Sequence, residues 1–288
     1  MMNKANFSDI GDWIRNLILD FVKSSENTLG NSNNDKVFDL PIVGFASGDD
    51  PIFNEFKNDI GSFYLTPLEV FKKYHPESSV KPDELTVISW VMPHIRQTKL
   101  DNQHENSYPS ERWARGKKYG IIFNIKLQKY LIQAFEENGY KAISPCAPSH
   151  WSEQISEKYG HSSTWSERHT AYAAGLGTFG ICDGLITQVG KAMRCGSIVA
   201  QIKIPPTKRV YTKHTEYCLY FSDGSCDACI KRCPAGAITQ KGHDKEKCKK
   251  YCESLCADYT KKMFDIEIET CGLCQTKVPC ESGIPMRK

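Results

Sequence analysis

The first 145 residues of this 288-residue chain contain no cysteine, and no run of about 18 apolar residues occurs anywhere. The N-terminal segment lacks a long apolar stretch, so we expect neither a signal peptide nor a membrane-spanning helix, and we expect a cytoplasmic protein. With 40% hydrophobic and 25% charged residues, the composition excludes disordered, collagen-like and membrane classes. A chain of this length can bury a core without cross-links, so its cysteines need another explanation.

The cysteines are concentrated near the C-terminus. Ten of the 13 lie between Cys218 and Cys280. In a reducing compartment, clustered cysteines more often bind metal or take part in redox chemistry than form structural disulfides. The three scattered ones, Cys146, Cys182 and Cys195, are expected to be small buried hydrophobic residues.

Positive charge is concentrated in the same region. From Lys203 to Lys288 the chain has 16 Lys and Arg against 11 Asp and Glu, whereas the first 202 residues have 21 against 23. Thiolate-bound clusters carry negative charge, so this excess favours local charge compensation over a nucleic-acid-binding patch.

Hydrophobic periodicity predicts alternating helices and strands up to about Lys208. The expected helices cover residues 8–23, with Ser8 as N-cap, 117–138 and 165–175. The expected strands cover residues 40–47, 86–93, 184–188 and 196–204, with a short one from residue 141. This order favours an α/β or α+β layered fold. The segment after Val210 has few large apolar residues, so we predict a second domain that gains folding energy from bound metal.

The most specific motif is C-x2-C-x3-C-P, formed by Cys226, Cys229, Cys233 and the proline that follows. It matches the bacterial ferredoxin run C-x2-C-x2-C-x3-C-P except at the first cysteine, whose place is taken by Asp223. In that run the last cysteine binds the other cluster, so a second cysteine set is expected.

The second set consists of Cys271, Cys274 and Cys280. Three further cysteines lie between the two sets at four-residue spacing, which would place them on one face of a helix; they are Cys248, Cys252 and Cys256.

Two [4Fe-4S] clusters need four thiolate ligands each. We assign one cluster to Cys226, Cys229, Cys280 and either Cys218 or Asp223, and the other to Cys233, Cys248, Cys271 and Cys274. Structural zinc is the alternative, because paired C-x2-C units also build zinc sites. Zinc explains neither the C-x3-C-P continuation nor crossed ligands, so iron–sulfur clusters are favoured.

Four segments together resemble the epoxyqueuosine reductase family, which is related to the reductive dehalogenases. They are WARGKKYG at 113–120, ERHTAYAAGLGTFG at 167–180, DKEKC ending at Cys248, and the two cysteine sets. Their order and spacing cover residues 85–280.

The resemblance implies an α+β protein in which an α/β layered, cobalamin-binding-type domain precedes a small ferredoxin-like domain with two [4Fe-4S] clusters. The expected division is 1–84, an N-terminal helix and strand segment that packs on the core; 85–210, the cofactor and substrate domain; and 211–288, the cluster domain. Electrons would pass through the clusters to cobalamin from an external low-potential donor such as a ferredoxin or flavodoxin.

The resemblance also implies functional residues. His161, 13 residues before Ala174, takes the place of an aspartate thought to donate a proton in the family, and a histidine can do the same. The alternative for His161 is a solvated loop position. Glu167 would belong to the same polar cluster and contact the cofactor, or it would stabilise a helix N-terminus.

Further candidates would contact the cofactor. Arg112 and Arg115 would bind a corrinoid carboxamide or phosphate, with Tyr119 facing the cofactor or substrate; a solvated basic turn is the alternative. Gly175 and Gly177 would let the backbone approach a flat macrocycle, or serve a tight turn after a helix.

The function expected from these motifs is reduction of a small organic substrate. The alternatives are a cobalamin-free ferredoxin-type electron-transfer protein, reduction of an epoxide in a modified nucleoside, and a zinc-stabilised binding module. Family members that act on tRNA usually carry a C-terminal helical-repeat domain, which does not follow the cysteine sets here. We therefore expect tRNA not to be the substrate, and no membrane partner.

Overall fold

The structure, a computed structural model, describes residues 9–286. Its centre is a four-stranded antiparallel sheet in the order β1-β2-β8-β3. The strands are β1 (Ile42–Ser47), β2 (Leu85–Pro93), β8 (Met193–Gln201) and β3 (Ala142–Ile143). All four were predicted from the sequence, although β8 begins three residues earlier than the expected range.

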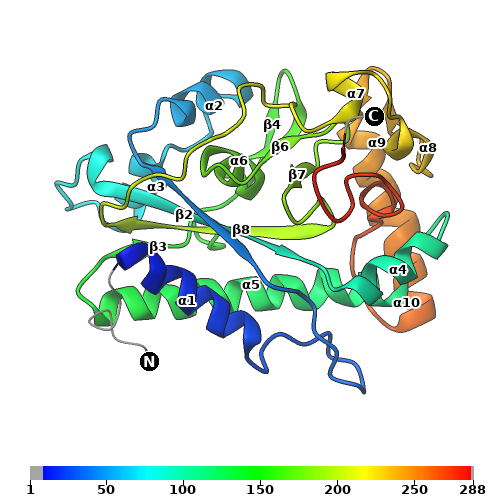
Figure 1. Cartoon of the computed structure of the whole chain (residues 1–288), viewed down its shortest axis with the longest axis horizontal. Coiled ribbons are helices and arrows are strands. Elements are labelled where there is room, and N and C mark those ends of the chain that lie inside the picture. The colour runs from blue at the N-terminus through cyan, green and yellow to red at the C-terminus, as the bar shows by residue number, and fades with distance from the viewer. Residues whose placement is uncertain (1–8, 287–288) are drawn as a thin grey trace.

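Helices cover both faces of this sheet, as Figure 1 shows. One face carries α1 (Ile10–Lys23) and the long α5 (Glu111–Glu137); the other carries α2 (Ile52–Ile60), α3 (Pro67–Tyr74) and α6 (Glu167–Ala173). The strand β2 serves both hydrophobic cores, because Ile88, Trp90 and Met92 face one while Val87 and Val91 face the other. This arrangement confirms the expected α+β layered fold.

Three helix starts differ from the sequence prediction, and α6 begins at Glu167, two residues after the expected start. The helix expected from residue 117 begins at Glu111, where the Ser110 hydroxyl accepts a hydrogen bond from the Trp113 N–H at 3.2 Å. Charged residues are frequent in this first turn, so the spacing of its apolar residues does not indicate a helix. In α1 the N-cap is Asp9, whose side chain accepts from Gly11 N–H, and Ser8 lies outside the described residues.

Several short elements of the first 210 residues link this framework. They are the 3₁₀ turn η2 (Pro82–Glu84), α4 (Arg96–His104), the hairpin β4 (Glu153–Ser156) and β5 (Gly160–Ser163), and the pair β6 (Gly177–Phe179) and β7 (Leu185–Thr187). Among these short elements, the sequence predicted only β7. It did not predict α4 or the β4–β5 hairpin, and it also did not predict the helices α2 and α3 on the sheet.

The C-terminal segment lies at one end of the sheet, beside α4 (Figure 1). Its elements are α7 (Leu219–Ser222), α8 (Ala228–Lys231), β9 (Ile238–Thr239), β10 (Gly242–His243), α9 (Lys245–Lys250), the π-helix η3 (Tyr251–Cys256), α10 (Ala257–Phe264) and η4 (Leu273–Gln275). A continuous helical run from Lys245 to Phe264 therefore occupies the part in which the sequence shows little periodicity.

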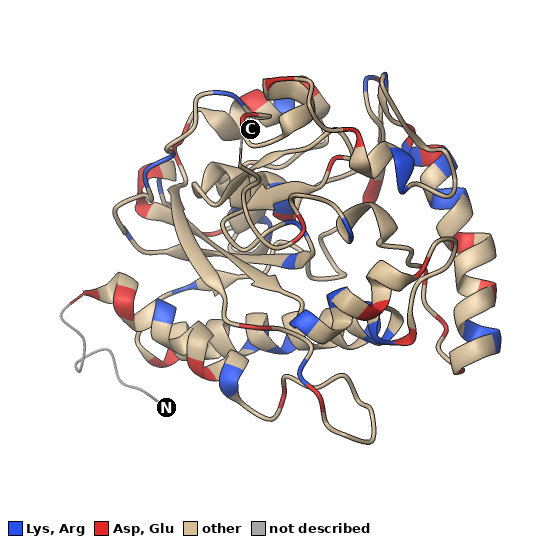
Figure 2. Ribbon diagram, turned by 45° about the vertical axis from the view of Figure 1, so that its right-hand side comes forward, with Lys and Arg blue, Asp and Glu red and all other residues tan. Residues whose placement is uncertain are grey.

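Within residues 9–286, no helix is long and apolar enough to cross a membrane. Basic and acidic residues are interspersed along the ribbon in Figure 2.

Candidate cysteine sites and interior polar site

Four cysteines line one hollow in the C-terminal segment. They are Cys218 at the N-cap of α7, Cys226 in the following loop, Cys229 in α8 and Cys280 near the chain end. The hollow has an empty volume of about 350 Å³, including open solvent, and its other walls are largely apolar, with Ile181 among them. An apolar wall lowers the local dielectric around bound thiolates. The sequence left the fourth ligand of this cluster open between Cys218 and Asp223, and these four cysteines are the set that contains Cys218.

The other candidate ligand lies elsewhere. Asp223 is not among the residues that line the hollow. It follows α7, and its carboxylate accepts a hydrogen bond from the Ser225 N–H at 2.9 Å. The geometry therefore favours Cys218 over Asp223.

A buried lysine accompanies this thiol group. Lys191, only 3% exposed, lines the hollow, and its Nζ donates to the Cys182 sulfur at 3.2 Å. The Cys182 thiol also interacts with Cys229 and Cys274, and these contacts hold the pKa of Cys182 well below its usual range. The ammonium group thus compensates negative charge on the sulfurs.

Sequence reasoning missed both residues. Cys182 was expected to be a small buried hydrophobic residue, yet it contacts cysteines of both sets. Its distance along the chain from those sets conceals this contact.

A second thiol group lies along the helical run. Cys252 interacts with Cys248 and Cys256, and these two contacts lower the pKa of Cys252 to about 3. Cys256 also interacts with Cys271. Cys233 is close enough to Cys248 to influence its pKa.

The contacts differ from the predicted division of ligands. Cys271 and Cys274, which the sequence assigned to one cluster, interact with different thiol groups, and the two unassigned cysteines, Cys252 and Cys256, join the second group. The sulfur of Cys233 accepts a hydrogen bond from the Ala237 N–H at 3.2 Å.

Each of the contacts between cysteines described above joins two thiol groups. Among residues 9–286, no three His, Cys, Asp or Glu side chains are placed to hold one metal ion. An iron–sulfur cluster does not require such convergence, because each iron takes its own thiolate.

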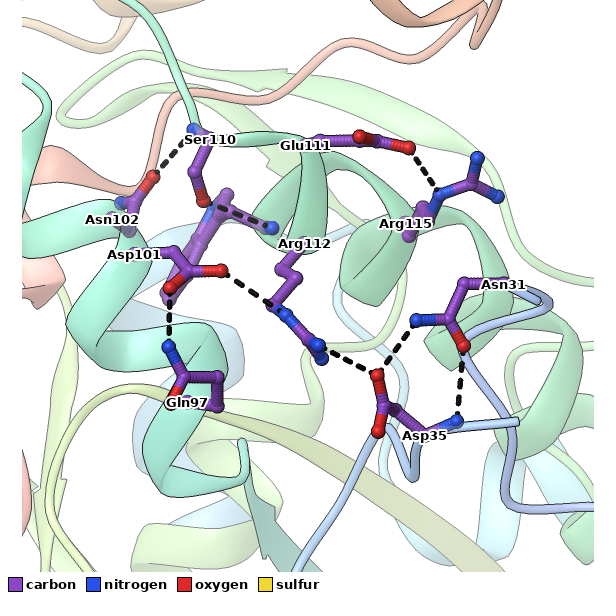
Figure 3. A network of polar contacts seen from close by, with 10 residues as sticks. Asn31, Asp35, Gln97, Asp101, Asn102, Ser110, Glu111, Arg112 and Arg115 are labelled. Carbon is purple, nitrogen blue, oxygen red and sulfur yellow. Dashed lines mark hydrogen bonds and ion pairs between the residues drawn. The ribbon is translucent and has the colours of Figure 1, made fainter. Parts of the chain in front are cut away.

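Arg112, Arg115 and Tyr119 contact the loop of residues 24–36, and Figure 3 shows the contact of Arg112 with Asp35. Arg112 binds Asp35 at 2.6 Å and Asp101 at 3.1 Å. Arg115 pairs with Glu111 at 2.8 Å and donates to the Gly30 carbonyl at 3.2 Å. The Tyr119 ring packs against Gly30. Arg112 and Arg115 line a second hollow, of about 840 Å³ including open solvent.

The two candidate glycines are closely approached by protein backbone. Gly175 has φ +77°, and a side chain there would lie 3.2 Å from the Lys208 carbonyl oxygen. At Gly177 a side chain would collide with the Ile186 carbonyl of β7. A tight turn and close strand packing account for both glycines.

His161 lies on the β4–β5 hairpin. Its Nε2 is 2.6 Å from the Glu246 carboxylate of α9, and its side chain is 27% exposed. The Lys245 ammonium also donates to the His161 carbonyl at 3.1 Å. These contacts tie the hairpin to the C-terminal segment.

Glu167 faces the interior from the first turn of α6. Its carboxylate lies beside Ser197 and the Cys146 thiol, and burial raises the pKa of Glu167. The Gln128 amide donates to one carboxylate oxygen at 3.4 Å, while the other oxygen has no hydrogen-bond partner among the described residues. Burial and the Glu167 charge also raise the pKa of Cys146. Glu167 is thus a half-buried acid whose surroundings favour its protonated form.

These features define a layered α+β protein with cysteine groups docked at the end of its sheet. In sequence, the chain is 24% identical over 284 residues to the epoxyqueuosine reductase of Bacillus anthracis, covering 92% of this chain and 67% of that protein. This similarity confirms the resemblance of the chain to the epoxyqueuosine reductases. No family model matches the chain.

One solved structure shares the fold with a TM-score above 0.5. A catabolic reductive dehalogenase matches with a TM-score of 0.51 and 13% identity, covering 95% of this chain and 37% of that one. An epoxyqueuosine reductase from Bacillus subtilis has a TM-score of 0.48 and 14% identity, covering 96% of this chain and 67% of that one.

Proposed function

We propose that the protein is a reductase with two [4Fe-4S] clusters that acts on a small organic substrate. The observation that carries this proposal is the single hollow lined by Cys218, Cys226, Cys229 and Cys280. The sequence similarity to an epoxyqueuosine reductase supports a reductive reaction.

The cysteines would hold the clusters, which supply single-electron transfer when bound. Cys218, Cys226, Cys229 and Cys280 would hold one cluster. The other cluster would take its ligands from Cys248, Cys252 and Cys256 on the helical run, together with Cys233, Cys271 or Cys274. Lys191 would compensate the charge of the first cluster. An external one-electron donor of low potential is the expected partner.

Cobalamin is the proposed second cofactor. This proposal rests on the resemblance of the segments 113–120 and 167–180 to the epoxyqueuosine reductase family. The contacts of Arg112, Arg115 and Gly177 are made with protein groups, so the described structure adds no support for corrinoid binding at these positions. The cob(II)alamin EPR spectrum tests it directly. Loss of the splitting from the lower axial nitrogen on adding the protein is expected; an unchanged spectrum with intact clusters would leave electron transfer as the function.

Two residues are candidate proton donors. Glu167 has a carboxyl group whose pKa is raised by burial, so it retains a proton at higher pH than an exposed glutamate. His161 remains the candidate from the family position, although it contacts Glu246. Replacing each with the matched amide or asparagine and comparing turnover distinguishes them.

The name of the curated relative favours a second candidate substrate, an epoxide in a modified nucleoside. Anaerobic assays with a free epoxynucleoside and with the corresponding tRNA test this candidate and the expectation that tRNA is not the substrate.

Cluster content provides the first test. In the anaerobically reconstituted protein, Cys218→Ser should lower bound iron and acid-labile sulfide by about half, because one of two clusters loses a ligand. Asp223→Ala is the matched control and should retain both. If Asp223→Ala loses iron and Cys218→Ser does not, the ligand assignment is reversed; a colourless protein containing zinc would refute the clusters.

A further inference from the structure

Lys191 is a buried cation on the wall of the first hollow. It lies in the turn between β7 and β8, is 3% exposed, and lines the hollow together with the four cysteines. Among the described residues, no aspartate or glutamate lines this hollow. The Lys191 Nζ donates instead to a sulfur, that of Cys182, at 3.2 Å. Because a buried ammonium needs a negative partner, the sulfurs are the groups that this lysine is placed to meet.

The backbone fixes Lys191 at this wall. Its N–H donates to the carbonyls of Cys280 at 2.9 Å and Glu281 at 3.1 Å. The preceding Gly190 has φ +86°, and a side chain there would collide with the Glu281 carbonyl. These main-chain contacts do not involve the ammonium, so a substitution of the Lys191 side chain leaves the turn and Cys280 in place.

The stem of the lysine is also closely packed. A side chain added at Gly184 would lie 2.9 Å from Lys191 Cδ and 3.3 Å from Cys182 Sγ. The stem and the sulfur therefore pack over the same glycine, and the hydrogen bond joins them there. Packing as well as charge sets the position of the ammonium.

The ammonium acts unequally on the two parts of the cysteine-rich segment. It lines the first hollow, whose other walls are largely apolar, so its charge is weakly screened there. Its partner Cys182 contacts Cys229 of that hollow and Cys274 of the second cysteine set. The second thiol group, on the helical run, does not line the hollow. Lys191 therefore stabilises negative charge in the first hollow more than on the helical run.

We propose that Lys191 raises the reduction potential of the cluster in the first hollow above that of the second cluster. This inference rests on the two-cluster reductase proposed above. One electron from the external donor makes a cluster one charge more negative, and a buried ammonium beside it stabilises that reduced form. No bond to Lys191 forms or breaks, and its proton stays on the ammonium. An electron shared by the two clusters then resides mainly in the first hollow.

The test is a redox titration of the anaerobically reconstituted full chain, followed by EPR. Lys191→Met removes the charge and keeps a long apolar stem, Lys191→Gln keeps an N–H donor without charge, and Lys191→Arg keeps the charge. The control is Lys231→Met, because Lys231 is an exposed lysine of α8, the helix that carries Cys229. Loss of one signal in Cys218→Ser identifies the cluster of the first hollow. Iron and acid-labile sulfide are measured in every sample.

We expect the first-hollow signal to titrate at the higher potential in the wild type. In Lys191→Met and Lys191→Gln its reduction equilibrium should fall by about tenfold or more, which is a shift of about 59 mV to lower potential for a one-electron couple. The other signal should move less. Lys191→Arg should keep most of the wild-type potential, and Lys231→Met should change neither signal, because solvent screens an exposed charge.

The proposal is overturned if the first-hollow signal titrates below the other in the wild type, or keeps its potential in the uncharged variants at full iron content. An equal shift in Lys231→Met also overturns it. If Lys191→Met alone loses iron, Lys191→Gln decides by its potential. If all three Lys191 variants lose the iron of the first hollow, the lysine is structural and the proposal fails.

The failure of this inference is distinct from failure of the proposed function. Two intact clusters whose potentials do not depend on Lys191 leave the two-cluster reductase standing. A wild type that binds no iron–sulfur cluster removes the proposed function itself, and this inference with it.

Discussion

Gly272 shows how one residue joins the cysteine-rich segment to the sheet domain. It lies between Cys271 and Cys274 with φ +70°, and a side chain there would collide with the Trp113 ring of α5. Both the backbone conformation and the space therefore require glycine.

We predict that Gly272→Ala lowers the unfolding temperature by several degrees more than Gly139→Ala. Gly139 has φ +79°, but an added side chain meets nothing within 4 Å. Gly139→Ala therefore measures the backbone strain alone, about 1 kcal/mol, whereas Gly272→Ala adds the collision with the Trp113 ring. Equal shifts in a thermal unfolding experiment would show that Trp113 moves away at no cost.

His94 makes stability depend on pH. Burial, followed by the charge of Arg194, lowers the pKa of this histidine from 6.5 to about 3. The unfolded chain therefore binds a proton below about pH 6.5 that the folded protein does not bind, so stability is fully present above that pH and decreases as pH falls towards 3.

We predict a loss of about 1 kcal/mol from His94 between pH 7.5 and 5.5. His94→Leu, which keeps an apolar contact with Phe38 and Trp113, should reduce this dependence. It should not abolish it, because burial also lowers the pKa of His169 to about 3. Urea unfolding at the two pH values measures the difference, and parallel profiles for variant and wild type would refute it.

At the scale of elements, Asn102 connects α4, α5 and η4. Its side chain is fully buried, accepts from the Ser110 N–H at 2.9 Å and donates to the Thr276 hydroxyl at 3.2 Å. One amide therefore holds the N-terminus of α5 and the second cysteine set in place.

We predict that Asn102→Leu lowers the free energy of unfolding by about 2 kcal/mol or more, because the Ser110 N–H and the Thr276 hydroxyl lose a buried partner. Gln133→Leu makes a similar change in side-chain size and polarity at an exposed position of α5, where only Glu137 is lost as a partner. The control should change stability by less than about 0.5 kcal/mol in urea unfolding. A small effect of Asn102→Leu would mean that water replaces the amide.

At the scale of the whole molecule, Arg232 anchors the C-terminal segment to the rest of the chain. Its guanidinium donates to the carbonyl of Glu105 at 2.7 Å and to that of Asn102 at 3.2 Å. It also donates to Leu273 and Thr276 carbonyls, both at 3.3 Å. A single side chain thus bridges three parts of the chain.

We predict that Arg232→Gln lowers the unfolding temperature by several degrees and speeds proteolysis within residues 211–286, because charged hydrogen bonds contribute about 1.5–3 kcal/mol each at most. The neighbouring Lys231→Gln removes the same charge from an exposed ion pair with Asp227 and should have little effect. Indistinguishable proteolysis of the two variants would show that the segment is held by its apolar contacts.

The strands of the central sheet, the helix of residues 117–137 and the cysteine-rich nature of the C-terminal segment follow from the sequence, because local periodicity and motif spacing carry that information. The grouping of Cys226, Cys229 and Cys280 was predicted in the same way from the ferredoxin-like spacing. The choice of Cys218 over Asp223 required the structure.

Only the tertiary structure brings Cys182 and Lys191 to the cysteines that line the first hollow. These residues are far apart in the chain or lie outside any motif, so no local pattern records their contact. Charges and thiols acquire their function from neighbours in space, because electrostatic interaction depends on distance and burial, and sequence order specifies neither.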